Sequence, residues 1–509
     1  MSKLGSGFRK SLVLVGVLAL VVPLLFAFAA PVSAATITVC ASGCDYTTIQ
    51  AAVNAANGGD VIHVFPGTYA EGVNLSDMPD PEGDLTLVTV NNAGVPTPGT
   101  VTVENPGAGS EIYTGVLPAF DGDLTIDGFN VHSIFPAINV TVSGDHDVEI
   151  RNVTATNVHD DGIRVWAESG DVTITNCTAS NNEGVGIWVG NTSGDVTITD
   201  CTANNNGAGA PFPGGLGIVV VAVKGDVLIS NCTANNNVCS INNRVHPEGY
   251  FVCGYGVWVE SPQGEVSISN CTMKGNSVAG AGAGLFPGAV SITDSVLEGN
   301  LIGVSGFNPT AGMLVNGSIV CGNTQYGLYV TEAGSVNAEG NWWGCAAGPG
   351  DAGCDPIVST GPTVDFTPWI SRISPSAAPD PVTVGEPTVV SFQFSANPTA
   401  VYLGKGPGDL RGPAPFTVSP DHGTLDGTGS TVHKFLGAEG TLKVTLVPEH
   451  GGTATVTVSG PCGLTDLEGS KAVVDVLAED FVPEPGTMLL LGSGLIGLAG
   501  YAGLRLRKK

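Results

Sequence analysis

A short alternation of apolar and polar residues recurs along the middle of the chain. It is clearest at residues 170–178, with the sequence GDVTITNCT, and it returns almost unchanged at residues 194–202. Further copies begin at Gly225 and Gly264, and a weaker one begins at Gly288. Alternation with a period of two predicts a strand with one buried face. One such strand cannot bury that face alone, so the copies are expected to stack as a solenoid.

A second strand is predicted after each turn, because a glycine followed by β-branched or aromatic residues recurs there. Its copies begin at Gly162, Gly186, Gly217, Gly256 and Gly327. The glycines that open the first strand are spaced by 24, 31, 39 and 24 residues. The constant part of this spacing corresponds to one coil, and the excess is expected to leave the coil as loops.

The two ends of this repeat carry recognisable segments. Residues 46–56 have helical apolar spacing, Thr47 or Thr48 can cap them, and a strand is predicted at residues 60–69. This entry resembles the N-terminal cap of pectin-lyase-like right-handed parallel β-helices. The Asn-Trp-Trp-Gly ending at residues 341–344 resembles the terminal rung of carbohydrate-binding and sugar-hydrolase-type β-helix proteins. The resemblance implies a β-helix with a helical cap over residues 35–370.

Residues 371–479 change character. Prolines mark their start, and alternating strands are predicted at residues 388–394, 441–446 and 453–458. The length and the strands favour an immunoglobulin-like sandwich, although its Cys…Trp…Cys hallmark is missing because Cys462 is the only cysteine of the segment. The predicted fold class is therefore all-β: a parallel β-helix, then a smaller sandwich, with targeting helices at both termini.

Both termini carry predicted targeting signals. Residues 1–34 combine a basic start, an apolar run and Val32-Ser33-Ala34, as in a signal peptide cut by signal peptidase. At the other end, Pro483, Glu484 and Pro485 precede an apolar run at residues 488–504 and a basic tail. Residues 480–509 resemble the PEP-CTERM sorting signal of Gram-negative bacteria. The resemblance implies recognition by an exosortase, a transient inner-membrane anchor through the C-terminal helix, and secretion or display at the cell surface, where exopolysaccharide is a candidate partner.

The chain is acidic, with a formal net charge of −28 over 509 residues. The two terminal tails hold seven of its 18 basic residues, so the body between them is more acidic still. Such a body repels nucleic acid and anionic lipid, which leaves only the terminal segments to contact a membrane. It would also repel a polyanionic sugar unless a divalent cation lay between them.

Ten of the 12 cysteines fall into two groups. Three pairs lie close in sequence within predicted loops and are candidate disulfides in an exported protein: Cys40 with Cys44, Cys239 with Cys253, and Cys345 with Cys354. Four others share one repeat position and are expected to form a buried column whose redox state stays open: Cys177, Cys201, Cys232 and Cys271. No Cys-x-x-Cys spacing or nearby histidine favours zinc there, so no metal site is predicted.

The candidate catalytic residues lie on one turn. His159, Asp160 and Asp161 precede a predicted strand, and a polysaccharide lyase or hydrolase needs a base or a pair of carboxylates. A plain solvated turn explains the same string. No cofactor is expected, although oxygen atoms of the Asp145-His146-Asp147 corner could hold calcium.

A candidate binding face follows from the alternation. If Val172 and Ile174 point inward, hydroxyl side chains point outward and form a flat two-column ladder: Thr173, Thr175, Thr197 and Thr199. Ordinary β-propensity explains the threonines equally well. Trp166, Trp188 and Trp258 recur on the second strand. As outward side chains they could stack on sugars, and as inward ones, the interpretation we favour, they belong to the core. The alternation does, however, put Trp166 on the same side of its strand as Arg164.

The function that we expect is that of a secreted or surface-sorted envelope or matrix protein. It would bind carbohydrate without catalysis or act as a scaffold. One alternative is a polysaccharide lyase or glycoside hydrolase that acts through Asp160 and Asp161, and another is an ice-binding protein that uses the threonine ladder. The fold does not choose among them.

Overall fold

The computed structural model describes residues 34–478, with internal gaps at 80–82, 105–111, 114–119, 133–134, 192, 209–214, 240–252, 261–262, 285–287, 308–310, 332–333, 398–415, 428, 430, 435–440, 461, 463 and 465–466. The predicted signal peptide, the Pro483–Glu484–Pro485 motif and the predicted C-terminal membrane helix lie outside these residues, apart from Ala34. The described chain divides into two compact units, each of which is described by itself.

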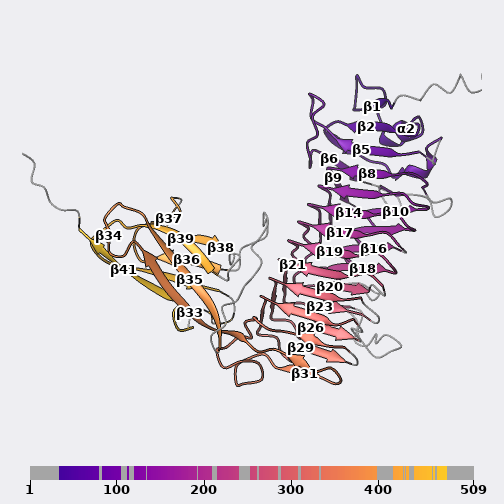
Figure 1. Cartoon of the computed structure of the whole chain (residues 1–509). Coiled ribbons are helices and arrows are strands. Elements are labelled where there is room, and N and C mark those ends of the chain that lie inside the picture. Colours follow the sequence, from indigo (N-terminus) through magenta and orange to yellow (C-terminus); the bar gives the residue numbers. More distant parts are fainter. Residues whose placement is uncertain are drawn as a thin grey trace, which may run out of the picture. The chain divides into compact units, whose positions relative to one another are not determined.

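The first unit is a stack of coils whose strands form parallel sheets (Figure 1). The longest sheet has 13 strands and is called sheet A. Its members are β1 (Thr36–Val39), β2 (Asp60–Val64), β5 (Leu85–Thr89), β8 (Leu124–Asp127), β11 (Val148–Arg151), β14 (Val172–Thr175), β17 (Val196–Thr199), β19 (Val227–Ser230), β21 (Val266–Ser269), β24 (Val290–Thr293), β27 (Met313–Asn316), β30 (Val336–Asn337) and β32 (Val364–Asp365).

The second long sheet, called sheet C, has 11 strands and contains the predicted second strand of each coil. Its members are β4 (Val73–Asn74), β7 (Ile112–Tyr113), β10 (Ile138–Val142), β13 (Ile163–Ala167), β16 (Ile187–Asn191), β18 (Ile218–Ala222), β20 (Tyr255–Glu260), β23 (Ala279–Ala283), β26 (Ile302–Phe307), β29 (Tyr326–Thr331) and β31 (Ile357–Ser359).

Shorter strands make the third face of the coil. They are β3 (Gly67–Tyr69), β6 (Val101–Glu104), β9 (Phe129–His132), β12 (Thr154–Thr156), β15 (Thr178–Ser180), β22 (Thr272–Lys274) and β25 (Val296–Glu298). Single bridges from Thr178 through Thr202 and Thr233 to Thr272 link β15 to β22. This arrangement confirms the predicted all-β class and the parallel β-helix.

The interior is built from columns of identical residues. In the register of β11, β14 and β17, Val148, Val172 and Val196 face one another in turn, and so do the isoleucines two residues later. Each of these side chains is fully buried, which stabilises the fold by about 1.5–3 kcal/mol per residue. The polar residues between them point outward, as the period of two requires.

The turns repeat as strictly as the strands. Asn176 and Asp200 adopt positive φ angles of 54° and 56°, a conformation that Asn and Asp tolerate better than most residues. At another corner, the side chain of each buried asparagine accepts the backbone N–H of its counterpart one coil earlier, as Asn206 does from Asn182 at 3.0 Å. The same ladder continues through Asn237, Asn276, Asn300 and Asn323.

The helical cap is shorter than predicted. The helix α2 covers only Ile49–Val53, followed later by a 3₁₀ turn η1 (Leu75–Asp77). Thr48 caps α2 by accepting the N–H of Ala51 at 3.3 Å. Its apolar side Ile49, Ala52 and Val53 is buried, which covers apolar surface at the first coil.

The second unit contains Ile319–Gly322 with β28 (Ile319–Cys321), residues 339–355, and the chain from Phe366 onward. It has two sheets. One is β33 (Trp369–Ala378), β35 (Thr388–Asn397), β39 (Thr441–Val447) and β37 (Thr424–Leu425); the other is β34 (Val382–Thr383), β41 (Lys471–Leu477), β40 (Gly452–Ser459), β36 (Phe416–Pro420) and β38 (Val432–Lys434). Buried residues such as Phe392, Val444 and Val456 alternate with more exposed ones, as in a two-sheet β region.

Candidate functional site

The three candidate catalytic residues lie on the turn between β12 and β13, and each has its own partner. His159 Nδ1 lies 2.8 Å from Glu183 Oε1 on the surface. Asp160 Oδ1 accepts the backbone N–H of Asp161 at 2.9 Å. Asp161 instead contacts Val185 and Arg164. Catalysis by these residues stays a prediction of the sequence.

Asp161 is the buried member of this turn, with only 4% of its side chain exposed. Its Oδ1 accepts the backbone N–H of Val185 at 2.7 Å, and its Oδ2 lies 2.6 Å from Arg164 Nη2. Burial raises the pKa of the Asp161 carboxyl, while the charge of Arg164 and the N–H of Val185 oppose that rise. The geometry makes Asp161 an anchor for Arg164, and the backbone of Val185 on the next coil holds its carboxylate in place.

Arg164 begins a group of flat side chains on the outer face of sheet C. Its Cζ lies 5.7 Å from the ring centroid of Trp188 on the next coil. The Trp188 ring is stacked with the Trp166 ring, with centroids 5.9 Å apart and planes inclined by 14°. We call Arg164, Trp166 and Trp188 the aromatic platform. Trp166 is 43% exposed, which is unusual for so large an apolar side chain.

The favoured assignment to the core is therefore wrong for Trp166, whereas Trp258 is buried. On β13, Ile163, Val165 and Ala167 are fully buried, so the alternation turns Arg164 and Trp166 outward. In the register of the sheet, Arg164 is opposite Trp188, and Trp166 is opposite Gly190. Arg164 was the visible signal, because its charge marks the outward parity of the strand.

Gly190 provides the space in which the two indoles lie. A Cβ atom at this position would come within 2.5 Å of Trp166 Cε3 and 2.5 Å of Trp188 Cη2. Such contacts are shorter than van der Waals packing permits, so any larger residue would push at least one ring away. The glycine therefore sets the geometry of the aromatic platform.

Trp258 also lies on the outer face of sheet C, but it is covered. It is only 2% exposed and belongs to a cluster with Tyr255, Val219 and Leu216, against which Trp188 packs. Burial raises the pKa of Tyr255 to about 12. The aromatic platform is thus the exposed end of a larger apolar surface, and the cluster supports it from one side.

The threonine ladder has the predicted register on sheet A. Thr173 pairs with Thr197, and Thr175 pairs with Thr199. The hydroxyls of Thr175 and Thr199 are 3.3 Å apart, and all four side chains are half-buried. Leu228, opposite Thr197 on β19, interrupts the ladder with an exposed apolar residue. The ladder as a binding face stays a prediction.

An acidic column borders sheet A. Carboxylates of successive coils each accept the backbone N–H of the acidic residue on the next coil, at 2.8–3.0 Å: Asp84, Asp123, Asp147, Asp171, Asp195 and Asp226. A groove of about 320 Å³ runs beside Asp123, Asp147 and Asp171. Ligand atoms of Asp84, Asp123 and His146 lie within 4.8 Å of one another, so among the described residues these three could together hold a cation.

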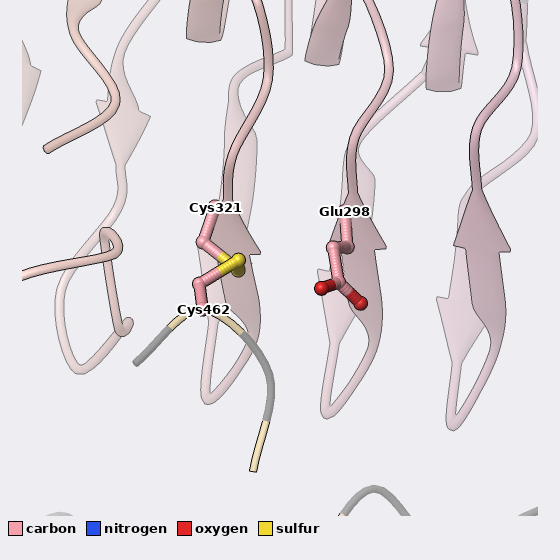
Figure 2. Close-up of side chains that lie close together, drawn as sticks. All are labelled: Glu298, Cys321 and Cys462. Atoms are coloured by element: carbon pink, nitrogen blue, oxygen red, sulfur yellow. A yellow bond between two sulfur atoms is a disulfide. The ribbon is translucent and has the colours of Figure 1, made fainter. Parts of the chain in front are cut away.

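The structure joins four pairs of cysteines. Three of them are the pairs assigned from the sequence: Cys40 with Cys44, Cys239 with Cys253, and Cys345 with Cys354. The fourth joins Cys321 to Cys462, 141 residues apart, and Figure 2 shows it together with Glu298. Sulfurs bonded to each other cannot act as thiolate ligands, so this group is not a metal site.

The four remaining cysteines form the expected column and are free and buried. Cys201 Sγ donates to the carbonyl of Thr199 at 3.1 Å, and Ser295 Oγ makes the equivalent bond to Thr293 at 2.8 Å. Because serine replaces cysteine at this position, the side chain serves here as a small donor to the turn. Burial raises the pKa of the Cys177 and Cys232 thiols, which favours their protonated form.

Comparisons with known proteins agree with this description. Residues 89–261 match the family model of the right handed beta helix region. Together with the parallel coils, this match defines the chain as a right-handed parallel β-helix protein. Residues 481–508 match the PEP-CTERM protein-sorting motif. The chain thus carries a PEP-CTERM sorting signal, which implies recognition by an exosortase and indicates export to the cell surface of a Gram-negative bacterium.

Solved structures share the β-helix at low similarity. A pectate lyase is 14% identical over 65% of this chain and 78% of its own, with a TM-score of 0.34. The A-module of an Azotobacter vinelandii mannuronan C-5 epimerase is 18% identical over 63% of this chain and 92% of its own, with a TM-score of 0.34. A tailspike protein of an Escherichia coli O157:H7 bacteriophage is 12% identical over 84% of this chain and 59% of its own, also at 0.34. At these TM-scores the likeness carries no argument about this chain.

No curated protein matches the chain. Within the described residues, none of the helices is long and apolar enough to cross a membrane.

Proposed function

We propose that this protein is an exported surface protein that binds polysaccharide without catalysis, through the aromatic platform. The observation that carries the proposal is the exposed indole of Trp166, stacked on Trp188 beside an arginine whose carboxylate partner is buried. An exposed tryptophan with fixed neighbours offers a large apolar face at little cost in conformational entropy. The C–H face of a sugar ring packs on such a surface, and the adjacent guanidinium donates to hydroxyl oxygens.

The address of the protein supports this assignment. A PEP-CTERM protein reaches the cell surface, where polysaccharide is abundant and forms a partner of high local concentration. A rigid β-helix also suits a weak binder, because side chains on a sheet hold their geometry without a change of the backbone. The terminal segments remain the only parts for which we propose contact with a membrane.

The proposal needs no cofactor at the aromatic platform, since every group in it is a side chain of the chain itself. A divalent cation would have its place elsewhere, at Asp84, Asp123 and His146, whose imidazole nitrogen suits a transition metal better than calcium. Binding that survives EDTA would separate the two sites.

Affinity electrophoresis of the full-length protein in gels that contain a panel of polysaccharides tests the proposal. We expect at least one polysaccharide to retard the protein, and Trp166→Ala to weaken the interaction by about 30-fold, as removal of a central aromatic contact does. Thr175→Ala on sheet A is the matched control and should bind like the wild type. The proposal fails if no polysaccharide retards the protein or if Trp166→Ala binds normally. Reducing ends that increase on incubation would reject the noncatalytic part.

A further inference from the structure

The charges around the aromatic platform say which polysaccharide it accepts. We infer that its ligand is a neutral polysaccharide, and that Asp161 positions Arg164 for hydroxyl oxygens instead of carboxylates. The inference rests on the proposed function, because it specifies the ligand of the same site. The evidence for it is the set of charged side chains on β13 and on the turns next to the aromatic platform.

Acidic groups surround the platform on both sides of β13. Asp160 and Asp161 precede the strand, and Glu183 lies on the equivalent turn of the next coil, where it contacts His159. Glu168 follows the strand with the same parity as Arg164 and Trp166, is exposed, and accepts the N–H of Gly144 at 3.1 Å. Glu168 is only two residues after Trp166 in the chain, at the bend where β13 ends, so it adds a negative charge to this end of the strand.

The only guanidinium of the platform does not offset this charge. Arg164 is one cation beside four carboxylates, and its charge is already opposed by Asp161 at 2.6 Å. A uronate chain laid on Trp166 would bring further carboxylates to this region, and each like-charged pair at about 7 Å is unfavourable even in water. A chain of net charge −28 adds repulsion at longer range.

Arg164 keeps donors that suit an uncharged ligand. A guanidinium carries five N–H donors in a fixed plane, and the ion pair with Asp161 engages the Nη2 edge. The same plane is held 5.7 Å from the Trp188 centroid, so its remaining edges are fixed beside the indoles. Arginine neutralised by its own carboxylate is a set of oriented donors with little net charge, which matches hydroxyl oxygens of a sugar.

Two variants with the same change of charge distinguish the positioning of Arg164 from the effect of negative charge alone. Asp161→Asn and Glu168→Gln each remove one negative charge, but only the first removes the ion pair of Arg164. We expect Glu168→Gln to leave neutral binding within about twofold of the wild type and to strengthen uronate binding by about threefold. We expect Asp161→Asn to weaken neutral binding by about tenfold and to strengthen uronate binding by more than Glu168→Gln does. Arg164→Gln provides the same test of neutral binding if Asp161→Asn fails to fold.

The experiment compares a neutral β-glucan with polygalacturonate and alginate in affinity gels. Full-length protein is used, in EDTA so that no divalent cation bridges like charges, at low and at high salt. The inference predicts retardation by the neutral glucan at both salt concentrations, at least tenfold stronger than by either uronate at low salt. Stronger uronate binding that still depends on Trp166 would overturn the inference and keep the proposed function. Equal responses of Asp161→Asn and Glu168→Gln would overturn the role of Asp161, and failure of every glycan would overturn the proposed function.

Discussion

The two long sheets of the β-helix share one interior but have different outer faces. On sheet A, the outward residues of β14 and β17 are threonines that repeat in register. On sheet C, the outward residues of β13 and β16 are an arginine, two tryptophans and a glycine. Inside, both sheets contribute fully buried isoleucine and valine.

This difference shows where a repeat protein places its chemistry. Interior positions must match their neighbours above and below, so each coil repeats the same residues. Residues on the outer face do not have to match the coils above and below, and the β-propensity of threonine is enough to explain its presence there. The departure from the repeat on sheet C, where side chains of different coils make specific contacts with one another, is the better indication of a selected site.

The largest effect is expected from the interior, where the two sheets should respond alike. Ile198 on β17 and Ile187 on β16 are both fully buried in the same region of the coil. Each change to alanine removes buried methyl groups and leaves a cavity, so each should lower the free energy of unfolding by about 3–4 kcal/mol. Urea unfolding followed by circular dichroism measures both, with Thr197→Ala as the surface control. A difference of more than about 1.5 kcal/mol between the two isoleucines would show that the sheets do not share one core.

A smaller effect is expected from Gly190→Ala on the outer face of sheet C. The added methyl group would displace Trp166 or Trp188, because its Cβ has no room beside their rings. Binding of the neutral glucan should fall by about tenfold with little change in stability, since the rings lie on the surface. Thr141→Ser, opposite Trp166 on β10, is the control on the same face and should bind normally. Unchanged affinity for Gly190→Ala would mean that the position of the rings does not matter.

The pH dependence of stability tests the burial of Asp161. Its pKa is raised in the folded protein above the ordinary value of 3.8, chiefly by burial. Because the folded protein holds this proton more tightly than the unfolded chain, protonation of Asp161 stabilises the folded state at a pH below 3.8. This stabilisation is lost as the pH rises through the pKa of the folded state. The free energy of unfolding of the wild type, measured relative to Asp161→Asn, should therefore fall as the pH rises from about 3 to neutrality.

The groups that face Asp161 are Arg164, Asp160 and the nearby His159–Glu183 pair, so Asp160→Asn is the control. The free energy of unfolding of the wild type, measured relative to Asp160→Asn, should show no comparable fall as the pH rises. A difference between wild type and Asp161→Asn that is constant with pH would show that Asp161 is not desolvated in the folded protein.

The smallest effect is expected on sheet A. Thr199→Ala removes a hydroxyl that lies 3.3 Å from that of Thr175 on a half-buried surface. Such a change should alter the free energy of unfolding by no more than about 0.5 kcal/mol and leave glucan binding unchanged. Thermal unfolding and affinity electrophoresis measure the two quantities. If Thr199→Ala abolished glucan binding, the outer face of sheet A would also take part in binding, and the proposed difference between sheets A and C would be wrong.

The repeated sequence predicted the fold because its alternation of apolar and polar residues determines which side chains are buried. Val172 and Ile174 recur as Val196 and Ile198, and their burial follows directly from the period of two. The disulfide between Cys321 and Cys462 could not be predicted, because neither cysteine has a close neighbour or a repeated position to suggest its partner.

The site was less predictable because its side chains come from turns and from different coils. His159, Asp160 and Asp161 are adjacent in sequence, yet hydrogen bonds of the turn direct them to separate partners. The alternation placed Trp166 on the same side of its strand as Arg164, but the core was still the favoured interpretation. The contact of Trp166 with Trp188 depends on Gly190, whose role appears only when two coils are placed in register.

Hydroxyl-radical footprinting of the full-length protein, with and without a saturating neutral glucan, tests the central claim most directly. Oxidation is read peptide by peptide by mass spectrometry and reports which surface the glycan covers. The account predicts that Trp166 and Trp188 become protected while the outer face of β14 and β17 reacts as before. Protection of residues 172–175 and 196–199 on sheet A, with Trp166 and Trp188 as reactive as in the free protein, would contradict it.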